Sequence, residues 1–254
     1  MKIIIMERKY LKNNYIGPDF QRVFKRYAWI IAVIGVILSR FFALDRMGLD
    51  ENVLFLYRFS TDMPGFILCF VFCGFVYGAS YAEDLENKYI RYCVMRGNLK
   101  KYIFSKMVMI YATSFLVMVA GTFIFSFICS TKVPWINDFG DIDYFRTVNY
   151  GNFVVIGKYY MYILLSAMHM GMAAGMLSNI AAVISIFIKN KVLAYAMPAI
   201  LYVVFIGKIT EYFNSEFALY TESSGVNFLI VFIISVVVSA MAAVVANMVL
   251  KRKL

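Results

Sequence analysis

The sequence predicts an all-α integral membrane protein with six transmembrane helices and both termini in the cytoplasm. Of its 254 residues, 62% are hydrophobic and 18% aromatic, with a mean hydropathy of +0.74, well above an ordinary soluble domain. Six apolar runs approach or exceed the roughly 20 residues that a helix needs to cross a bilayer, and they lack the alternation of a β-barrel. One transmembrane domain is expected over residues 1–254, with cytoplasmic segments at 1–26 and 251–254 and the bundle at 27–250.

The six runs differ in length. The first and fifth are slightly short for a span, whereas the fourth is long and must tilt, bend or extend beyond the hydrocarbon core. In chain order the runs are Tyr27–Leu44, Pro64–Ala82, Met107–Cys129, Tyr159–Ile188, Val192–Ile209 and Val226–Leu250.

Lysine and arginine are unevenly distributed among the loops, and this predicts the orientation. Eighteen of the 25 lie in the N-terminal segment, in 83–106, in 189–191 and at the C-terminus, whereas six lie in the alternate loops. Because basic residues favour cytoplasmic loops, an even number of spans with both ends inside is predicted, in the cell membrane. The net charge of +10 is therefore attributed to membrane-flanking loops, and no nucleic-acid partner is expected.

The basic N-terminal segment precedes the first run. Gly17-Pro18 interrupts it, and Asp19 is predicted to cap a helix that continues through Phe24 and Tyr27 into the first span. Two interpretations remain open: a plain positive tail that holds this end inside, or an interfacial helix that leads into the span.

The segment Glu83–Lys106, between the second and third runs, is densely charged. Its first half has helical spacing, in which Asp84 and Lys88 can pair at i,i+4. Gly97 suits the end of one helix and Asn98 the start of the next. The segment therefore predicts a short helix at the membrane surface, a tight bend and the first turn of the third span. The alternative is a solvated loop with anchoring charge.

The other loops, 45–63, 130–158 and 210–225, are modest in length. The first two are polar and aromatic, with Pro134-Trp135 and Tyr144 suited to the headgroup region. A folded outer domain is not expected in any of them.

Catalytic patterns are absent from the sequence. It contains no phosphate-binding loop and no Gly-x-Ser-x-Gly elbow. The single histidine, His169, excludes a two-histidine zinc site. Cys69 and Cys73 share a helix face without an adjoining histidine or acid, and are interpreted as small buried residues rather than metal ligands. The chain is therefore not expected to be an enzyme or to bind a metal.

Two ionisable side chains lie within the apolar runs. Arg40 is near the outer end of the first run, so its stem is expected to reach the headgroups. His169 is expected to be hydrogen-bonded between helices or to line a pore. A proton-coupled carrier needs a relay of intramembrane acids, which the runs lack.

Two small-residue motifs predict close helix packing. Gly74 and Gly78 lie four apart in the second run, and Gly171 and Gly175 lie four apart in the fourth, followed by Asn179. Such spacing flattens one helix face, and Asn179 can add a hydrogen bond across the contact. These motifs are interpreted as intramolecular seams rather than dimer interfaces.

The span layout and two segments together resemble the type-two permeases of ATP-binding-cassette exporters. The first segment is Tyr81–Lys106, with acidic residues at its start and basic residues where it re-enters the membrane. The second is Ser178–Val204, with the polar turn Lys189-Asn190-Lys191 and a proline, Pro198, in the next run. The resemblance covers nearly the whole chain, although this chain has a more aromatic first outer loop and no sizeable outer domain.

The resemblance implies a mechanism and partners. Two permease chains, as a homodimer or heterodimer, would surround a path through the lipid membrane. Separate ATPase subunits would bind ATP and Mg²⁺, and this chain itself is expected to bind no cofactor. The surface helix at Glu83–Arg96 would dock on an ATPase. The implied docking residues are Glu83, Asp84, Glu86, Lys88, Arg91, Arg96, Gly97 and Asn98. The path would be lined by spans two and five, where Tyr77, Ser80, Tyr195 and Tyr202 are the candidate side chains. So few polar groups suggest an amphipathic or apolar cargo, such as a peptide antibiotic, a drug or a lipid-like molecule.

Three other functions compete with export. A secondary carrier or channel acting alone predicts midplane charges or repeated broken helices. A membrane scaffold that docks a soluble partner through residues 83–106 predicts the same loop as a permease. A membrane enzyme is the third.

Overall fold

The computed structural model describes residues 15–24, 27–44, 51–90, 98–137, 139–146, 148–188, 190–204 and 224–253, and these contain helices and no strands. The helices are α2 (Ile16–Phe24), α3 (Ala28–Leu44), α4 (Val53–Asp62), the 3-10 helix η1 (Pro64–Phe66), α5 (Ile67–Phe75), α6 (Ser80–Glu86), α8 (Leu99–Ser130), α9 (Phe139–Arg146), α10 (Asn152–Val155), α11 (Tyr159–Phe187), α12 (Lys191–Val204) and α14 (Ser224–Lys253).

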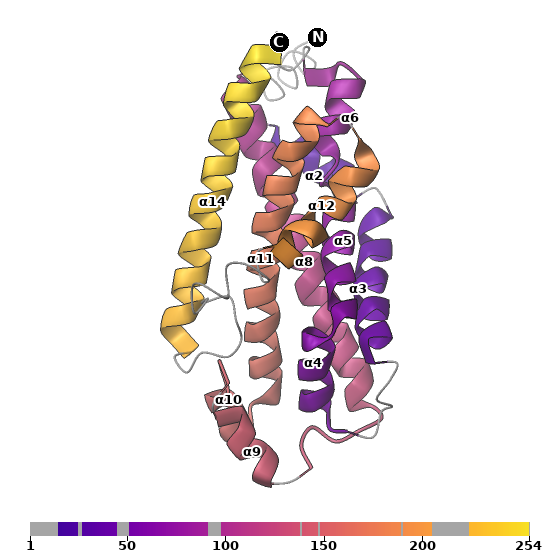
Figure 1. Ribbon diagram of the computed structural model, residues 1–254, viewed down its shortest axis with the longest axis vertical. Helices are drawn as coiled ribbons and strands as arrows, with labels where there is room; N and C mark the ends of the chain where they lie inside the picture. Colours follow the sequence, from indigo (N-terminus) through magenta and orange to yellow (C-terminus); the bar gives the residue numbers. More distant parts are fainter. Residues whose placement is uncertain are drawn as a thin grey trace, which may run out of the picture.

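Three long helices, α8, α11 and α14, run along the long axis of the bundle (Figure 1). Each is long and apolar enough to cross a membrane, and counting each of two bent helix pairs as one span gives up to five. The bent pairs are α2 with α3 and α4 with η1–α5, whereas α12 has 14 described residues. The prediction of an all-helical membrane protein is thus confirmed at the level of three to five candidate spans.

The two ends of the bundle differ. One carries α6 and the C-terminal end of α14, and is called the α6 end here; the other carries α9 and α10, and is called the α9 end (Figure 1). At the start of α8, near the α6 end, the side chain of Asn98 accepts a hydrogen bond from the backbone N–H of Lys100. The predicted role of Asn98 as a helix cap is confirmed.

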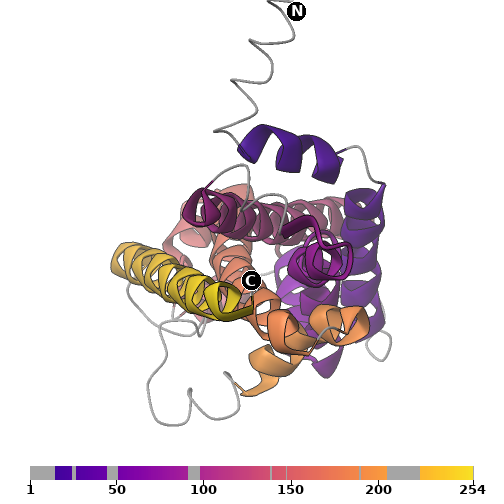
Figure 2. The ribbon, with the colours of Figure 1, turned by 90° about the horizontal axis from the view of Figure 1, so that it is seen from above.

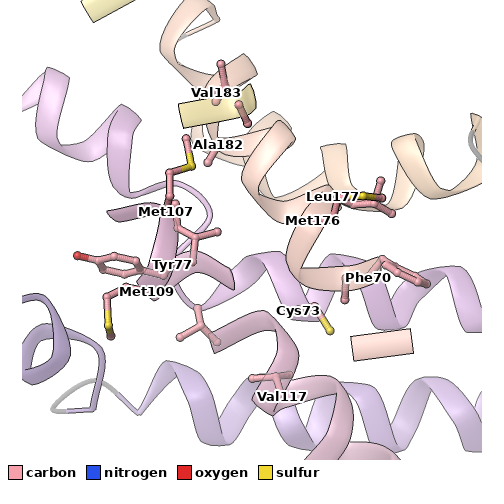
Figure 3. Packing of buried hydrophobic residues seen from close by; sticks show 14 of the residues in the cluster. Phe70, Cys73, Tyr77, Met107, Met109, Val117, Met176, Leu177, Ala182 and Val183 are labelled. Atoms are coloured by element: carbon pink, nitrogen blue, oxygen red, sulfur yellow. The ribbon is translucent and has the colours of Figure 1, made fainter. Parts of the chain in front are cut away.

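The main core lies where α5, α8 and α11 meet (Figure 3). Phe70 and Cys73 contribute from α5, Met107 and Met109 from α8, and Met176 from α11. Methionine is unbranched and fills irregular gaps between helices, which suits a core formed where three helices meet. Cys69, Cys73 and Cys129 are buried free thiols, and the expectation of buried apolar roles for Cys69 and Cys73 is confirmed.

A second, aromatic core lies toward the α9 end. It joins apolar residues of α4, α9 and α10 to the end of α3 and to the neighbouring turns of α8 and α11. Tyr57 and Phe145 are fully buried and both pack edge-on against Tyr162. The segments 45–63 and 130–158, expected as loops of modest length, thus contain three short helices, α4, α9 and α10. Of the residues assigned to the headgroup region, Tyr144 is exposed and Trp135 is half-buried.

Helix α2 lies crosswise to the bundle on its outer side, next to α8 (Figure 2). Its apolar residues Ile16, Phe20 and Phe24 are exposed, whereas Asp19 is buried against the protein. A soluble helix shows the opposite pattern, and an exposed apolar stripe suits a helix lying in the membrane interface. The helix of the second interpretation is present at 16–24, and its position in the membrane interface stays a prediction.

The second apolar run is not one continuous helix. Helix α5 ends at Phe75, a turn occupies 76–79, and α6 begins at Ser80. The N–H of Gly78 donates to the carbonyl of Gly74 at 2.9 Å, and a Cβ on Gly78 would approach that same oxygen to 2.5 Å. Only a residue without a Cβ fits this tight turn without a clash at the Gly74 carbonyl oxygen, so glycine is needed at position 78.

Candidate functional site

Seven polar side chains from α2, α8 and the region around α6 meet inside the protein near the α6 end. We call this group the ionic cluster. Its members are Asp19, Arg22, Tyr77, Asp84, Tyr102, Ser105 and Lys106. With two acids and two bases, the cluster is electrically balanced.

Lys106 lies at the centre of the ionic cluster and is fully buried. Its Nζ is 2.9 Å from Oδ2 of Asp84 and 3.3 Å from Oδ1 of Asp19, and it donates to the hydroxyl of Tyr77 at 2.6 Å. Three acceptors therefore match the three N–H donors of the ammonium group, which offsets the cost of burying the charge.

Asp84 is the second buried charge. Its Oδ1 is 2.8 Å from Nη1 of Arg22, and its Oδ2 accepts the hydroxyl of Tyr102 at 2.7 Å. Burial alone would raise the pKa of this carboxyl, but the ammonium of Lys106 and the hydrogen bonds from Lys106, Arg22 and Tyr102 lower the pKa below its ordinary value. The carboxylate form of Asp84 is thus favoured by its partners.

Asp19 connects α2 to the rest of the ionic cluster. Its Oδ1 accepts the hydroxyl of Tyr77 at 2.6 Å, and its Oδ2 accepts the hydroxyl of Ser105 at 2.7 Å. The sequence predicted Asp19 as a helix cap, but the residue lies inside α2 and faces α8. Through Asp19 and Arg22, the crosswise helix is fastened to α6 and α8 together.

Beside the ionic cluster is an open hollow of about 310 Å³ lined by Arg22, Asp84, Asn87 and Tyr89. Arg22 also approaches Glu83, with its Nη2 3.6 Å from Oε2. The hollow lies at the edge of the buried ion-pair network.

The predicted docking residues separate into different environments. Asp84 is buried and pairs with Lys106 and Arg22 rather than with Lys88, so its carboxylate is not displayed for a partner. Glu86 is exposed and lies 2.6 Å from Nζ of Lys191 at the start of α12, a contact that raises the pKa of Lys191. Glu83 is half-buried.

The surface helix expected over Glu83–Arg96 is interrupted. Helix α6 ends at Glu86, and Lys88, which is exposed, has a φ of 56°, in the left-handed region that L-residues seldom adopt. Helical conformation resumes at Tyr89 and Ile90. The remaining predicted docking residues, Arg91, Arg96 and Gly97, lie outside the described residues.

Three of the four motif glycines pack against another helix of the chain, as predicted, whereas Gly78 lies in the turn after α5. A Cβ on Gly171 would lie 2.9 Å from the ring of Phe115, and one on Gly175 would lie 2.8 Å from the ring of Tyr111, both on α8. A Cβ on Gly74 would lie 2.8 Å from the ring of Pro198 on α12. The buried amide of Asn179, in contrast, has no hydrogen-bond partner in the part of the chain that the structure describes.

The four candidate pathway residues fall in two places. Tyr77 belongs to the ionic cluster, and Ser80 is buried at the start of α6. Tyr195 and Tyr202 on α12 contact α5: the ring centroid of Tyr202 is 3.9 Å from that of Phe70, and Tyr195 lies beside Phe75. The two tyrosines of α12 therefore fill the α5–α12 interface.

The two ionisable residues of the spans are both inside the protein. His169 is buried, with its Nδ1 3.0 Å from the hydroxyl of Tyr150, which agrees with the hydrogen-bonded interpretation. Arg40 has none of its surface exposed, so the expectation that its side chain reaches the headgroups is wrong. Hydroxyl groups and aromatic rings of α4, η1 and α8 surround it instead.

Sequence reasoning missed the ionic cluster because its partners are far apart along the chain. Lys106 and Asp19 are separated by 87 positions; Asp19 was assigned to a helix cap and Lys106 to membrane-flanking charge. The available signal was weak: Asp19 and Arg22 lie on one face of a short amphipathic helix whose other face is apolar. Across the described residues, no group of three or more His, Cys, Asp and Glu side chains could hold a metal ion.

Comparison of the chain with protein-family models, with curated proteins and with solved structures finds no match.

Proposed function

We propose that this chain is the membrane-spanning permease subunit of an ATP-binding-cassette exporter, driven by ATP that separate subunits hydrolyse. The proposal begins from the apolar helices that can cross a membrane and from the charged segment that joins the second and third apolar runs. A permease of this kind needs a surface that an ATPase can move and a mechanical connection from that surface to the spans.

The observation that carries the proposal is the buried ion pair between Asp84 of α6 and Lys106 of α8. Removing one partner of a buried pair typically costs about 3–5 kcal/mol, so a displacement of α6 is opposed unless α8 moves with it. Asp19 and Arg22 extend the same connection to α2. A force on the α6 end is thereby delivered to a 32-residue helix that runs the length of the bundle.

The docking surface in this proposal comprises the exposed residues Glu86 and Lys88 together with Arg91 and Arg96 farther along the segment. Charge on such a surface provides specificity for the partner more than raw affinity. ATP binding shifts the permease between inward- and outward-facing states only if the ATPase binds the two states differently. Two permease chains and two ATPase subunits complete the proposed assembly.

The proposed cargo is amphipathic or apolar. Helices α5 and α12, which line the path in this proposal, meet through aromatic side chains such as Phe70, Phe75 and Tyr202. An ion or a sugar needs a series of polar groups in place of its hydration shell, whereas the α5–α12 interface offers mainly ring surfaces.

Co-purification in mild detergent tests the assignment. Reversing both Arg91 and Arg96 to Glu is expected to weaken recovery of an ATPase with the chain. The matched control reverses Lys132 and Lys158, two exposed lysines toward the α9 end, and is expected to leave recovery unchanged. Equal recovery of a phosphate-loop ATPase with both double variants would contradict the docking surface.

The purified complex also tests the cargo. We expect its ATPase activity to rise with hydrophobic peptides or drugs and to ignore small polar solutes. The opposite response would exclude an amphipathic cargo. A partner that co-purifies but is not an ATPase would replace export with the scaffold function.

A further inference from the structure

Arg40, on α3 toward the α9 end, is a buried cation that the proposed mechanism does not use. Its side chain has no exposed surface, and Arg40 lies in an apolar run that is expected to cross the membrane. Intramembrane charges are expensive and usually paired, so each is a candidate for a functional site.

One edge of the Arg40 guanidinium is satisfied by the protein. Nη1 donates to Oγ of Ser60 at 2.9 Å and to Oγ1 of Thr61 at 3.2 Å, both at the C-terminal end of α4. The rings of Phe66 and Tyr57 lie 4.9 and 5.1 Å from Cζ. These aromatic faces attract the cation and offset part of the cost of its burial.

The other edge is not satisfied. Nε and Nη2 of Arg40 are buried and have no hydrogen-bond acceptor among the described residues, and Arg40 takes part in none of the ion pairs between described residues. Nε–H and the adjacent Nη2–H point in parallel from one side of the planar guanidinium. This pair of donors is the fork that binds a carboxylate through both oxygens.

The chain bends sharply beside Arg40. The bend between α4 and η1–α5 is 76°, and Phe66 of η1 is one of the rings beside the guanidinium. Broken helices within a membrane are tolerated where they are buried in protein or line a cavity or a binding site.

We propose that Arg40 binds the carboxylate of a small or amphipathic molecule through Nε and Nη2, in a site between α3, the α4–η1 bend and α8. A planar, singly charged carboxylate matches two parallel donors and one positive charge. A phosphate dianion would leave net negative charge among Tyr57, Phe66 and Phe125. The rings of these residues suit an apolar portion next to the carboxylate. This site is independent of the proposed export function, since it requires only binding.

Thermal unfolding of the purified full chain in detergent tests the site. Octanoate is expected to raise the Tm of the unmodified protein, by roughly 5–10 °C at a concentration about a hundredfold above Kd. Octanamide, with the same tail and no charge, is expected to leave the Tm unchanged. Acetate distinguishes the two kinds of ligand. A Tm shift with acetate indicates that a small free carboxylate is enough for binding, and a Tm shift with octanoate alone indicates that the ligand is amphipathic.

Variants of Arg40 assign the effect to this residue. Arg40→Met keeps the length of the side chain among the aromatic rings, and we expect it to abolish the Tm shift caused by octanoate. Arg40→Lys keeps the charge but lacks the two parallel N–H donors, and we expect it to reduce that shift. Arg146→Gln, at an exposed arginine of α9, should retain the full shift. Any of three results would overturn the proposal. They are equal Tm shifts with octanoate and octanamide, no Tm shift with octanoate or acetate, and a full Tm shift with octanoate in Arg40→Met. The comparison of octanoate with octanamide on the unmodified chain needs no variant to fold.

Discussion

Nζ of Lys106 lies 2.9 Å from Oδ2 of Asp84, and neither side chain is exposed to solvent. The pair joins the short helix α6 to the long helix α8, and Asp19 brings the crosswise helix α2 into the same contact. Three helices that apolar packing alone would leave free to slide are therefore held in one register near the α6 end.

Replacing Lys106 with Met tests this connection. The change leaves two buried carboxylates, Asp19 and Asp84, without their shared cation, and we expect a loss of about 3–5 kcal/mol in the free energy of unfolding. Unfolding in mixed micelles, followed by circular dichroism, measures the loss. Lys100→Gln, at an exposed lysine six positions earlier in α8, should change stability by no more than about 0.5 kcal/mol. Comparable losses in both variants would contradict a special role for Lys106.

The ionic cluster predicts a pH dependence of stability with a definite sign. The pKa of Asp84 is lower in the folded protein than its ordinary value. Its contribution is therefore complete above the unfolded pKa of about 4 and is lost as the pH falls from there through the folded pKa. Thermal unfolding between pH 7 and pH 3 should show a decline that begins near pH 4. Asp84→Asn should be less stable at pH 7 and should flatten this decline, whereas an unchanged decline would assign it to other carboxyl groups.

Close packing of α5 on α12 predicts that Gly74→Ala is destabilising. A Cβ at this position would lie 2.8 Å from Cγ of Pro198, and the rigid ring cannot move aside, so we expect a loss of roughly 1–3 kcal/mol. Gly17→Ala is the matched control, because nothing lies within 4 Å of a Cβ there, and Pro198→Ala should partly rescue Gly74→Ala. Losses of equal size at Gly74 and Gly17 would show that helix packing is not the cause.

Local patterns in the sequence predicted the helical class, most helix positions and the cap at Asn98, because these depend on neighbours within a few residues. The seams of Gly171 and Gly175 were also predictable, because a flattened helix face needs a partner. The sequence could not predict which helix provides that partner. It could not predict the ionic cluster or the surroundings of Arg40 either. Each joins side chains that are 20 or more positions apart.

Two predictions failed for instructive reasons. Residues 53–62 were assigned to a polar and aromatic loop between two apolar runs, yet they form α4, in which Arg58 and Asp62 pair at 3.4 Å and which packs among aromatic rings. Arg40 was expected to reach the membrane surface, yet its hydroxyl and ring partners lie on α4, η1 and α8, and hold it inside.

Thiol labelling of intact cells tests the central claim, that the α6 end faces the cytoplasm and receives its partner there. Lys88→Cys, at an exposed position after α6, is introduced with Cys93 replaced by Ser, and Lys158→Cys, at an exposed position before α11, is the control for the opposite end. We predict that a membrane-impermeant maleimide labels Cys at 158 in intact cells, and labels Cys at 88 only in inverted vesicles. Labelling at 88 from outside intact cells would contradict the account.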